Sequence, residues 1–168
     1  DISILQCNIH DRNKNPELIL DRIRGENFPD IILIQEATPK MEDIFKRIHV
    51  WYPYTVEAPQ SGAYGMVLFS KIPIVKAQRK RFETSPNRYT IVEFVTAHKK
   101  IPFTLVELHA TSPARDPHMD RKQELEELPA IMAQTASDHK ILVGDLNTTP
   151  YSPYFWELKD ALNVKNAA

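Results

Sequence analysis

Residues 141–150 read Ile-Leu-Val-Gly-Asp-Leu-Asn-Thr-Thr-Pro, and this stretch decides the interpretation of the chain. Its apolar start, between Lys140 and Gly144, predicts a short buried strand. Asp145 and Asn147 follow at the strand's C-terminal end, and residues two apart on an extended chain point the same way. Ligand sites usually form at such ends in α/β sheets. Asp and Asn are also ordinary turn residues, so this segment alone supports both interpretations.

The composition is that of a soluble globular domain of 168 residues, with 42% hydrophobic and 26% charged residues. The net charge of −1 provides no general basic field for holding nucleic acid, so any polyanion must bind at a local patch. Cys7 is the only cysteine, which excludes an internal disulfide. We expect one domain over residues 1–168.

The chain opens at Asp1, directly in an apolar strand pattern and without a methionine or a signal peptide. No apolar run reaches the length of a membrane span. We therefore expect a soluble domain from which upstream residues are missing. The cellular location and the oligomeric state cannot be assigned from these residues.

Apolar periodicity predicts an α/β chain in which helices flank a central run of strands. Pro53 marks residues 52–56 as an edge strand, and Pro129 predicts a kink or break in a helix over residues 118–136. That helix buries Leu125, Leu128 and Met132, and its polar face (Arg121, Lys122, Glu126 and Glu127) should be solvated. Two sheets packed face to face, with helices outside, fit this order. The remaining strands are expected at residues 2–7, 30–36, 64–70, 72–78, 89–95 and 103–108, and the remaining helices at 16–25, 39–50 and after Ser152.

Polar side chains that can perform chemistry recur where apolar strands end. Four strands share this feature, so their side chains would converge on one rim if the strands were neighbours. They are Asn8, Glu36, His109, Asp145 and Asn147.

These residue types suit Mg²⁺, which prefers oxygen ligands and is often held by one or two carboxylates plus substrate phosphate oxygens. Glu36 would anchor the metal, and the metal and His109 would neutralise charge on a phosphoryl group. Asp145 would orient or deprotonate an attacking water, while Asn8 and Asn147 hold substrate or water in line. Zinc fits less well than Mg²⁺, because Cys and His ligands at structured spacing are absent, and a zinc hydrolase stays a third alternative. A Gly-x-Ser-x-Gly nucleophile turn and a Walker-type phosphate loop are both absent from the sequence.

Each assignment has a structural alternative. Glu36 could be a charge at a helix N-terminus, and His109 a hydrogen-bonded histidine at a strand end. Asn8 could be a capping or turn residue, and Tyr64 could either line the cleft or pack.

Five motifs together resemble the endonuclease/exonuclease/phosphatase superfamily, which has the DNase I-like fold. The upstream Gln-Glu and the Gly-Asp-hydrophobic-Asn-x-x-Pro element are its specific parts. Residues 151–158 resemble a less characterised bacterial branch, often found behind N-terminal membrane segments that could tether the domain. The five motifs are Asn8, residues 34–36, Tyr64-Gly65 leading to 69–74, residues 109–113 and residues 144–150.

The resemblance implies a four-layer α-β-β-α sandwich and hydrolysis of phosphoesters with Mg²⁺ or Mn²⁺. It assigns Glu36 to the metal, Asn8 to the metal or substrate, His109 to phosphate contact, and Asp145 with Asn147 to water and substrate. Tyr64 would join substrate binding. Candidate substrates are nucleic acid, a phospholipid head group or a phosphoinositide.

One departure from the family pattern concerns the Asp-His pair that follows the family's last strands. Here Asp138-His139 precedes residues 141–150, and the chain stops at Ala168. We expect a domain whose C-terminal segment and last strands are missing, which would expose a sheet edge. The alternative is a binding domain that retains the fold but has lost catalysis.

Overall fold

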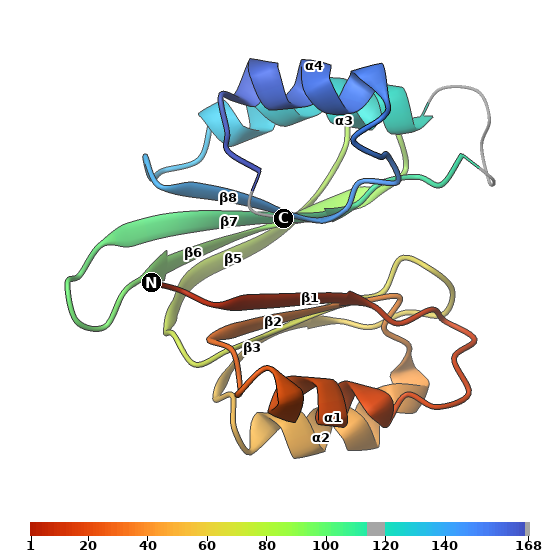
Figure 1. Ribbon diagram of the computed structural model, residues 1–168, viewed down its shortest axis with the longest axis vertical. Helices are drawn as coiled ribbons and strands as arrows, with labels where there is room; N and C mark the ends of the chain where they lie inside the picture. Colours follow the sequence, from red (N-terminus) through yellow and green to blue (C-terminus); the bar gives the residue numbers. More distant parts are fainter. Residues whose placement is uncertain (114–119, 167–168) are drawn as a thin grey trace. The chain divides into compact units, whose positions relative to one another are not determined.

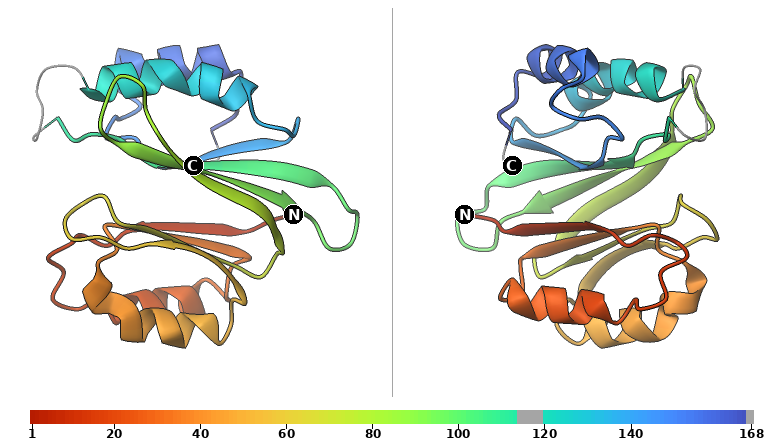
Figure 2. Two further views of the ribbon diagram at one scale, coloured as in Figure 1. Left: turned by 180° about the vertical axis from the view of Figure 1, so that it is seen from behind. Right: turned by 45° about the vertical axis from the view of Figure 1, so that its right-hand side comes forward.

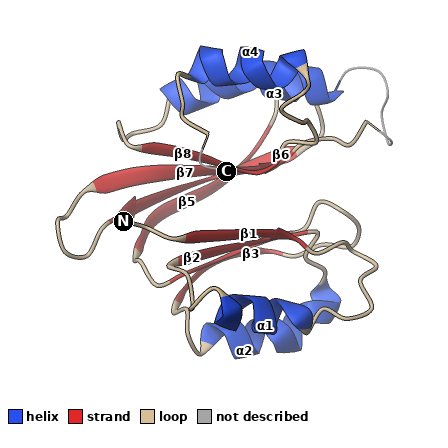
Figure 3. Ribbon diagram, viewed as in Figure 1, coloured by secondary structure: helices blue, strands red, loops and turns tan. Residues whose placement is uncertain are grey.

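Two four-stranded sheets, each with two helices, form the part of the chain that the computed structural model describes, residues 1–113 and 120–166. The chain divides into two units, described separately below. The first unit comprises Asp1–Ala77 and Glu93–Pro102, and the second comprises Gln78–Val92 and Phe103–Ala168. Figure 3 distinguishes their helices and strands by colour.

The first unit holds the sheet with strand order β1-β2-β4-β3. Strand β2 (Ile31–Gln35) is buried along its whole length, between β1 (Ile4–Asn8) and β4 (Met66–Ser70). It runs parallel to β1 and antiparallel to β4. Strand β3 (Tyr54–Ala58) pairs only with β4, so the expected edge strand lies two residues later than predicted.

Helices α1 (Leu18–Gly25) and α2 (Glu42–His49) cover one face of this sheet, and a 3₁₀ turn at Pro39–Met41 precedes α2 (Figure 1). Apolar side chains at helical spacing face the sheet, as the periodicity predicted. They form one core with Ile32, Ile34 and Phe69 of the strands. The helical members are Ile19, Leu20, Ile23, Ile44, Phe45 and Ile48.

The other sheet has strand order β5-β6-β7-β8. Its strands are β5 (Ile74–Arg81), β6 (Arg88–Val95), β7 (Pro102–His109) and β8 (Lys140–Asp145), and β8 runs parallel to β7. Helices α3 (Asp120–Ala133) and α4 (Pro153–Leu162) lie side by side over one face of this sheet in each view of Figures 1 and 2. Leu125, Leu128 and Met132 are buried in its core, as predicted.

One expectation about the second unit is wrong. Strand β8 is only partly buried along its length, because among the described residues it is the last strand of its sheet and pairs only with β7. Of the kink or break expected at Pro129, the break is absent, because helix α3 continues through this residue. Proline removes one backbone hydrogen bond, and burial of the neighbouring Leu125 and Leu128 holds the helix together. The predicted start of this helix, at His118, lies outside the described residues.

Among the described residues, no helix combines the length and the apolar character needed to cross a membrane.

Candidate active site

Strand pairing brings Asn8, Glu36 and Tyr64 to one edge of the first sheet. Asn8 is opposite Gln35 in the parallel β1–β2 pair, and Glu36 is the next residue after Gln35. Strand β4 begins at Met66, which is also opposite Gln35, so the turn that contains Tyr64 lies at the same edge. Of the polar residues predicted at strand ends, Asn8 and Glu36 thus lie together, and the role of Tyr64 stays a prediction.

Gly65 fixes the chain directly after Glu36. Its carbonyl oxygen accepts a hydrogen bond of 3.0 Å from the N–H of Ala37. A Cβ atom at position 65 would lie 1.8 Å from the Ala37 carbonyl oxygen, closer than any real side chain allows. Glycine is therefore required here by backbone contact, and the contact holds Glu36 beside the turn.

The Glu36 carboxylate is held by the last residue of β1 and by the loop that follows this strand. Asn8 Nδ2 donates to Oε1 at 3.1 Å, and the N–H of Asp11 donates to Oε2 at 2.9 Å. The N–H of His10 donates to Asn8 Oδ1, which fixes the orientation of the amide. Glu36 has φ +60°, a left-handed conformation that is costly for a residue with a side chain. Both donors belong to the end of β1 and the loop that follows it. A charge at a helix N-terminus would instead accept hydrogen bonds from the first N–H groups of the 3₁₀ turn.

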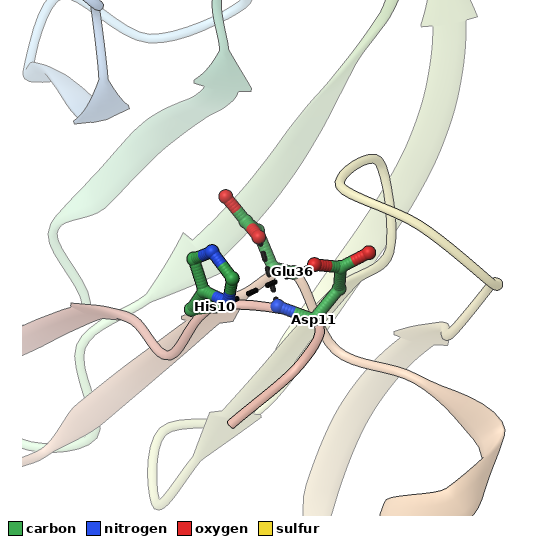
Figure 4. Close-up of side chains that lie close together, drawn as sticks. All are labelled: His10, Asp11 and Glu36. Carbon is green, nitrogen blue, oxygen red and sulfur yellow. Dashed lines mark hydrogen bonds and ion pairs between the residues drawn. The ribbon is translucent and has the colours of Figure 1, made fainter. Parts of the chain in front are cut away.

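His10, Asp11 and Glu36 form a group that can hold a metal ion (Figure 4). One ligand atom from each lies within 4.8 Å of the others. Two carboxylates suit Mg²⁺ or Mn²⁺. Asn8 lies beside them, with its amide nitrogen toward Glu36 and its oxygen toward the His10 N–H. Sequence reasoning treated residues 10–15 only as a polar loop, because the signal, a His-Asp pair two residues after Asn8, has no regular spacing.

His109 and Asp145 lie opposite each other in the parallel β7–β8 pair of the second unit. His109 Nε2 is 3.9 Å from Asp145 Oδ2, and the side chains are 8% and 36% exposed, respectively. This distance is too long for a hydrogen bond, although catalytic contacts often tighten only when substrate binds. The carboxylate therefore remains accessible to water beside a nearly buried imidazole.

Asn147 is built into the turn after β8. Its N–H donates to Asp145 Oδ1 at 2.9 Å, and its Nδ2 donates to the Ala110 carbonyl at 2.6 Å. Arg121 of α3 donates to the Asn147 carbonyl at 2.5 Å, and Asn147 has φ +47°. The structure thus brings Asn147 together with Asp145 and His109, and the convergence of this group with Asn8 and Glu36 stays a prediction.

Two residues that sequence reasoning missed support or adjoin this strand end. Asn87, in the loop before β6, donates from Nδ2 to the His109 carbonyl at 2.6 Å. Glu107 precedes His109 by two residues on β7 and is 1% exposed. Burial raises the pKa of Glu107 to about 8, against the opposing charge of Arg79. Burial also lowers the pKa of Arg79, with a further contribution from Arg88.

Residues 5–165 match the model of the Endonuclease/Exonuclease/phosphatase family, which is nearly the whole chain. The chain belongs to this family. The resemblance drawn from its motifs is confirmed, and so is the DNase I-like α/β sandwich as its fold class.

Solved structures of several differently named proteins have a similar fold. The D. rerio TDP2 complex with single-strand DNA product is similar at TM-score 0.77 and 17% identity, over 94% of this chain and 64% of that one. Sphingomyelinase C from Streptomyces griseocarneus is similar at TM-score 0.77 and 18% identity, over 99% and 71%. A β-hairpin deletion mutant of Staphylococcus aureus beta toxin gives 0.75 and 18%, over 99% and 74%.

This family member spans less than two thirds of the D. rerio TDP2 chain. No curated protein sequence matches it significantly. At these identities the structural likeness shows the fold alone.

Proposed function

We propose that this family member is a phosphoester hydrolase that depends on Mg²⁺ or Mn²⁺ and directs water onto phosphorus. The observation that carries the proposal is the Glu36 cluster, where an acidic side chain in a left-handed backbone conformation lies beside Asp11 and His10. Strain of this kind persists where the surrounding structure enforces it, and it concentrates at functional sites.

Glu36 and Asn8 would hold the metal, with Asp11 and His10 as the additional ligands at this edge. The donor set fits, because carboxylate and amide oxygens are the ligands that these hard cations prefer. A bound divalent cation supplies charge neutralisation at a phosphoryl oxygen. Asn8 would keep the Glu36 carboxylate oriented through the 3.1 Å bond from Nδ2.

The second unit would supply the groups that act on water and phosphate. Asp145 would orient the attacking water or take its proton, since its carboxylate is 36% exposed. His109 would donate from Nε2 to a phosphoryl oxygen, where negative charge develops in the transition state. Asn147 would hold water or substrate through the part of its side-chain amide that does not bond the Ala110 carbonyl.

The substrate class we propose is a phosphodiester of nucleic acid or of a phospholipid head group, with Tyr64 contributing to its binding. TDP2 from D. rerio, crystallised with a single-strand DNA product, and sphingomyelinase C, a lipid enzyme by its name, represent these two classes. The net charge of −1 argues against an enzyme that tracks along DNA, because phosphate contacts dominate affinity for nucleic acid.

Hydrolysis of bis-p-nitrophenyl phosphate across a Mg²⁺ titration tests the proposal. We expect metal-dependent turnover that Glu36→Ala abolishes, while Glu42→Ala on the exposed surface of α2 retains it. If the wild-type chain shows no turnover at any Mg²⁺ concentration, the result favours the alternative of a non-catalytic binding domain.

A further inference from the structure

The end of strand β7 is held by side chains from three different elements. Asn87, before β6, bonds the His109 carbonyl, and Asn147, after β8, bonds the Ala110 carbonyl, each at 2.6 Å. Glu124, on helix α3, bonds the next residue, Thr111. Three consecutive residues are thus each fixed by a long-range hydrogen bond.

Glu124 is a buried carboxylate whose two oxygens both accept hydrogen bonds. Oε2 accepts from the N–H of Thr111 at 2.8 Å. Oε1 accepts from Thr111 Oγ1 at 2.7 Å and from Ser85 Oγ at 2.6 Å. The residue is 0% exposed, and a carboxylate is retained in such a place when its hydrogen bonds compensate for lost hydration. Its position therefore defines where Thr111 and the 85–87 loop lie.

The position of Thr111 is connected through the backbone to His109 and Asp145, the candidate catalytic residues. Thr111 follows Ala110, whose N–H donates to the Asp145 carbonyl at 2.8 Å. His109 is opposite Asp145 in the strand register. A displacement of Thr111 would therefore move the backbone of both His109 and Asp145.

We propose that Glu124 is a positioning residue for phosphoester hydrolysis, which sets the place of His109 and Asp145 through Thr111. This inference rests on the proposed function and adds to it a residue of α3. Reacting groups must be held closely, because a misplacement of about 1 Å can lower a rate about 100-fold.

Glu127, nearly one turn later on α3, provides a matched control. It also accepts three hydrogen bonds, from the N–H groups of Glu83 and Thr84 at 2.9 and 2.8 Å and from the Thr84 hydroxyl. None of these donors belongs to residues 109–111 or 145–147. Loss of either carboxylate removes three bonds, but only Glu124 bonds directly to a residue at the end of β7, Thr111.

The test compares Glu124→Leu, Glu124→Gln and Glu127→Leu in Mg²⁺-dependent hydrolysis of bis-p-nitrophenyl phosphate. We expect Glu124→Leu to lower kcat about 10- to 100-fold with a change of less than about threefold in KM. Glu124→Gln should restore kcat, because Oε1 can accept from the Thr111 N–H while both hydroxyls rotate to accept from Nε2. Glu127→Leu should leave kcat within about threefold of the wild type.

A readout without turnover accompanies the kinetics. We expect the NMR signals of the His109 ring and the Thr111 amide to shift in Glu124→Leu and to remain in place in Glu127→Leu. If Glu124→Leu does not fold, Thr111→Val replaces it, since that change removes the hydroxyl bond and retains side-chain shape. We expect it to lower kcat about tenfold.

Equal kcat losses in Glu124→Leu and Glu127→Leu, or an unchanged His109 ring signal in the former, would overturn the positioning role and leave the proposed function intact. A wild-type protein without metal-dependent turnover would overturn both.

Discussion

The two groups of candidate residues are held in place by different means. In the first unit, candidate side chains bond one another and their own loop, as Asn8 and the Asp11 N–H do with Glu36. In the second unit, side chains from other elements bond the backbone of the candidate residues, as Asn87 does at His109. The first arrangement fixes a carboxylate, whereas the second fixes a strand end.

This difference predicts which substitutions lower activity alone and which lower both activity and stability. A substitution in the first group should remove chemistry while the fold remains, because the bonds lie at an edge and the backbone there is strained. A substitution of a residue that holds the backbone of the second group, such as Asn87 or Glu124, should lower both activity and stability, because buried polar partners are left unpaired. Variants in both units test this contrast.

Replacement of Glu36 by Gly or Ala should lower metal-dependent turnover about 1000-fold, since a lost cation removes several kcal/mol of transition-state stabilisation. The two variants should differ in stability. Glu36 has φ +60°, so glycine should be more stable than alanine there by about 1 kcal/mol. Urea unfolding of both variants measures this difference, and an alanine variant at least as stable as the glycine variant would contradict the strain.

Gly65→Ala should destabilise the fold by about 3 kcal/mol and weaken Mn²⁺ binding, because the new methyl group overlaps the Ala37 carbonyl and displaces Glu36. Gly25→Ala is the matched control, since a Cβ at position 25 meets no atom within 4 Å. Unfolding curves and Mn²⁺ titration calorimetry report the two effects. Similar results for the two alanines would show that the Gly65–Ala37 contact does not position Glu36.

Glu107 should make the stability of the wild type fall as the pH rises from about 5 to 8. Its pKa is 4.5 in the unfolded chain and about 8 in the folded protein, so the unfolded chain ionises at lower pH. Between these two values, rising pH stabilises the unfolded state relative to the folded state. Glu107→Gln cannot release a proton and should be more stable than the wild type at pH 8 by about 2 kcal/mol. Urea unfolding at pH 5 and pH 8 gives both values, and parallel pH profiles for the two proteins would contradict burial of this carboxyl.

Glu126→Gln should change the stability by less than about 0.5 kcal/mol. Glu126 is 3.5 Å from Lys122 in an exposed i,i+4 pair on α3, and water screens such pairs. Thermal unfolding checks this value. A loss of stability as large as the one measured for Glu124→Leu would show that substitutions along the whole surface of α3 destabilise the fold, not only those at its contacts with the loops.

Local patterns predicted most elements and the polar residues at strand ends, because alternation and helical spacing are properties of short segments. The exposure of β8 could not be predicted, since an apolar Ile-Leu-Val run does not reveal its place in the sheet order. The bonds of Arg121 and Glu127 on the polar face of α3, to Asn147 and to the 83–84 loop, could not be predicted either, because their partners are distant in the chain. Glu124 was missed for the same reason, because its partners lie 13 and 39 residues away in the chain.

The central claim is that the Glu36 group and the His109 group serve one reaction. A double-mutant cycle on kcat/KM with Glu36→Gln and His109→Gln tests it most directly. Residues that act as a unit have non-additive effects, so the double variant should lose no more than about tenfold beyond the weaker single variant. A double loss equal to the product of the two single losses would show that the groups act independently.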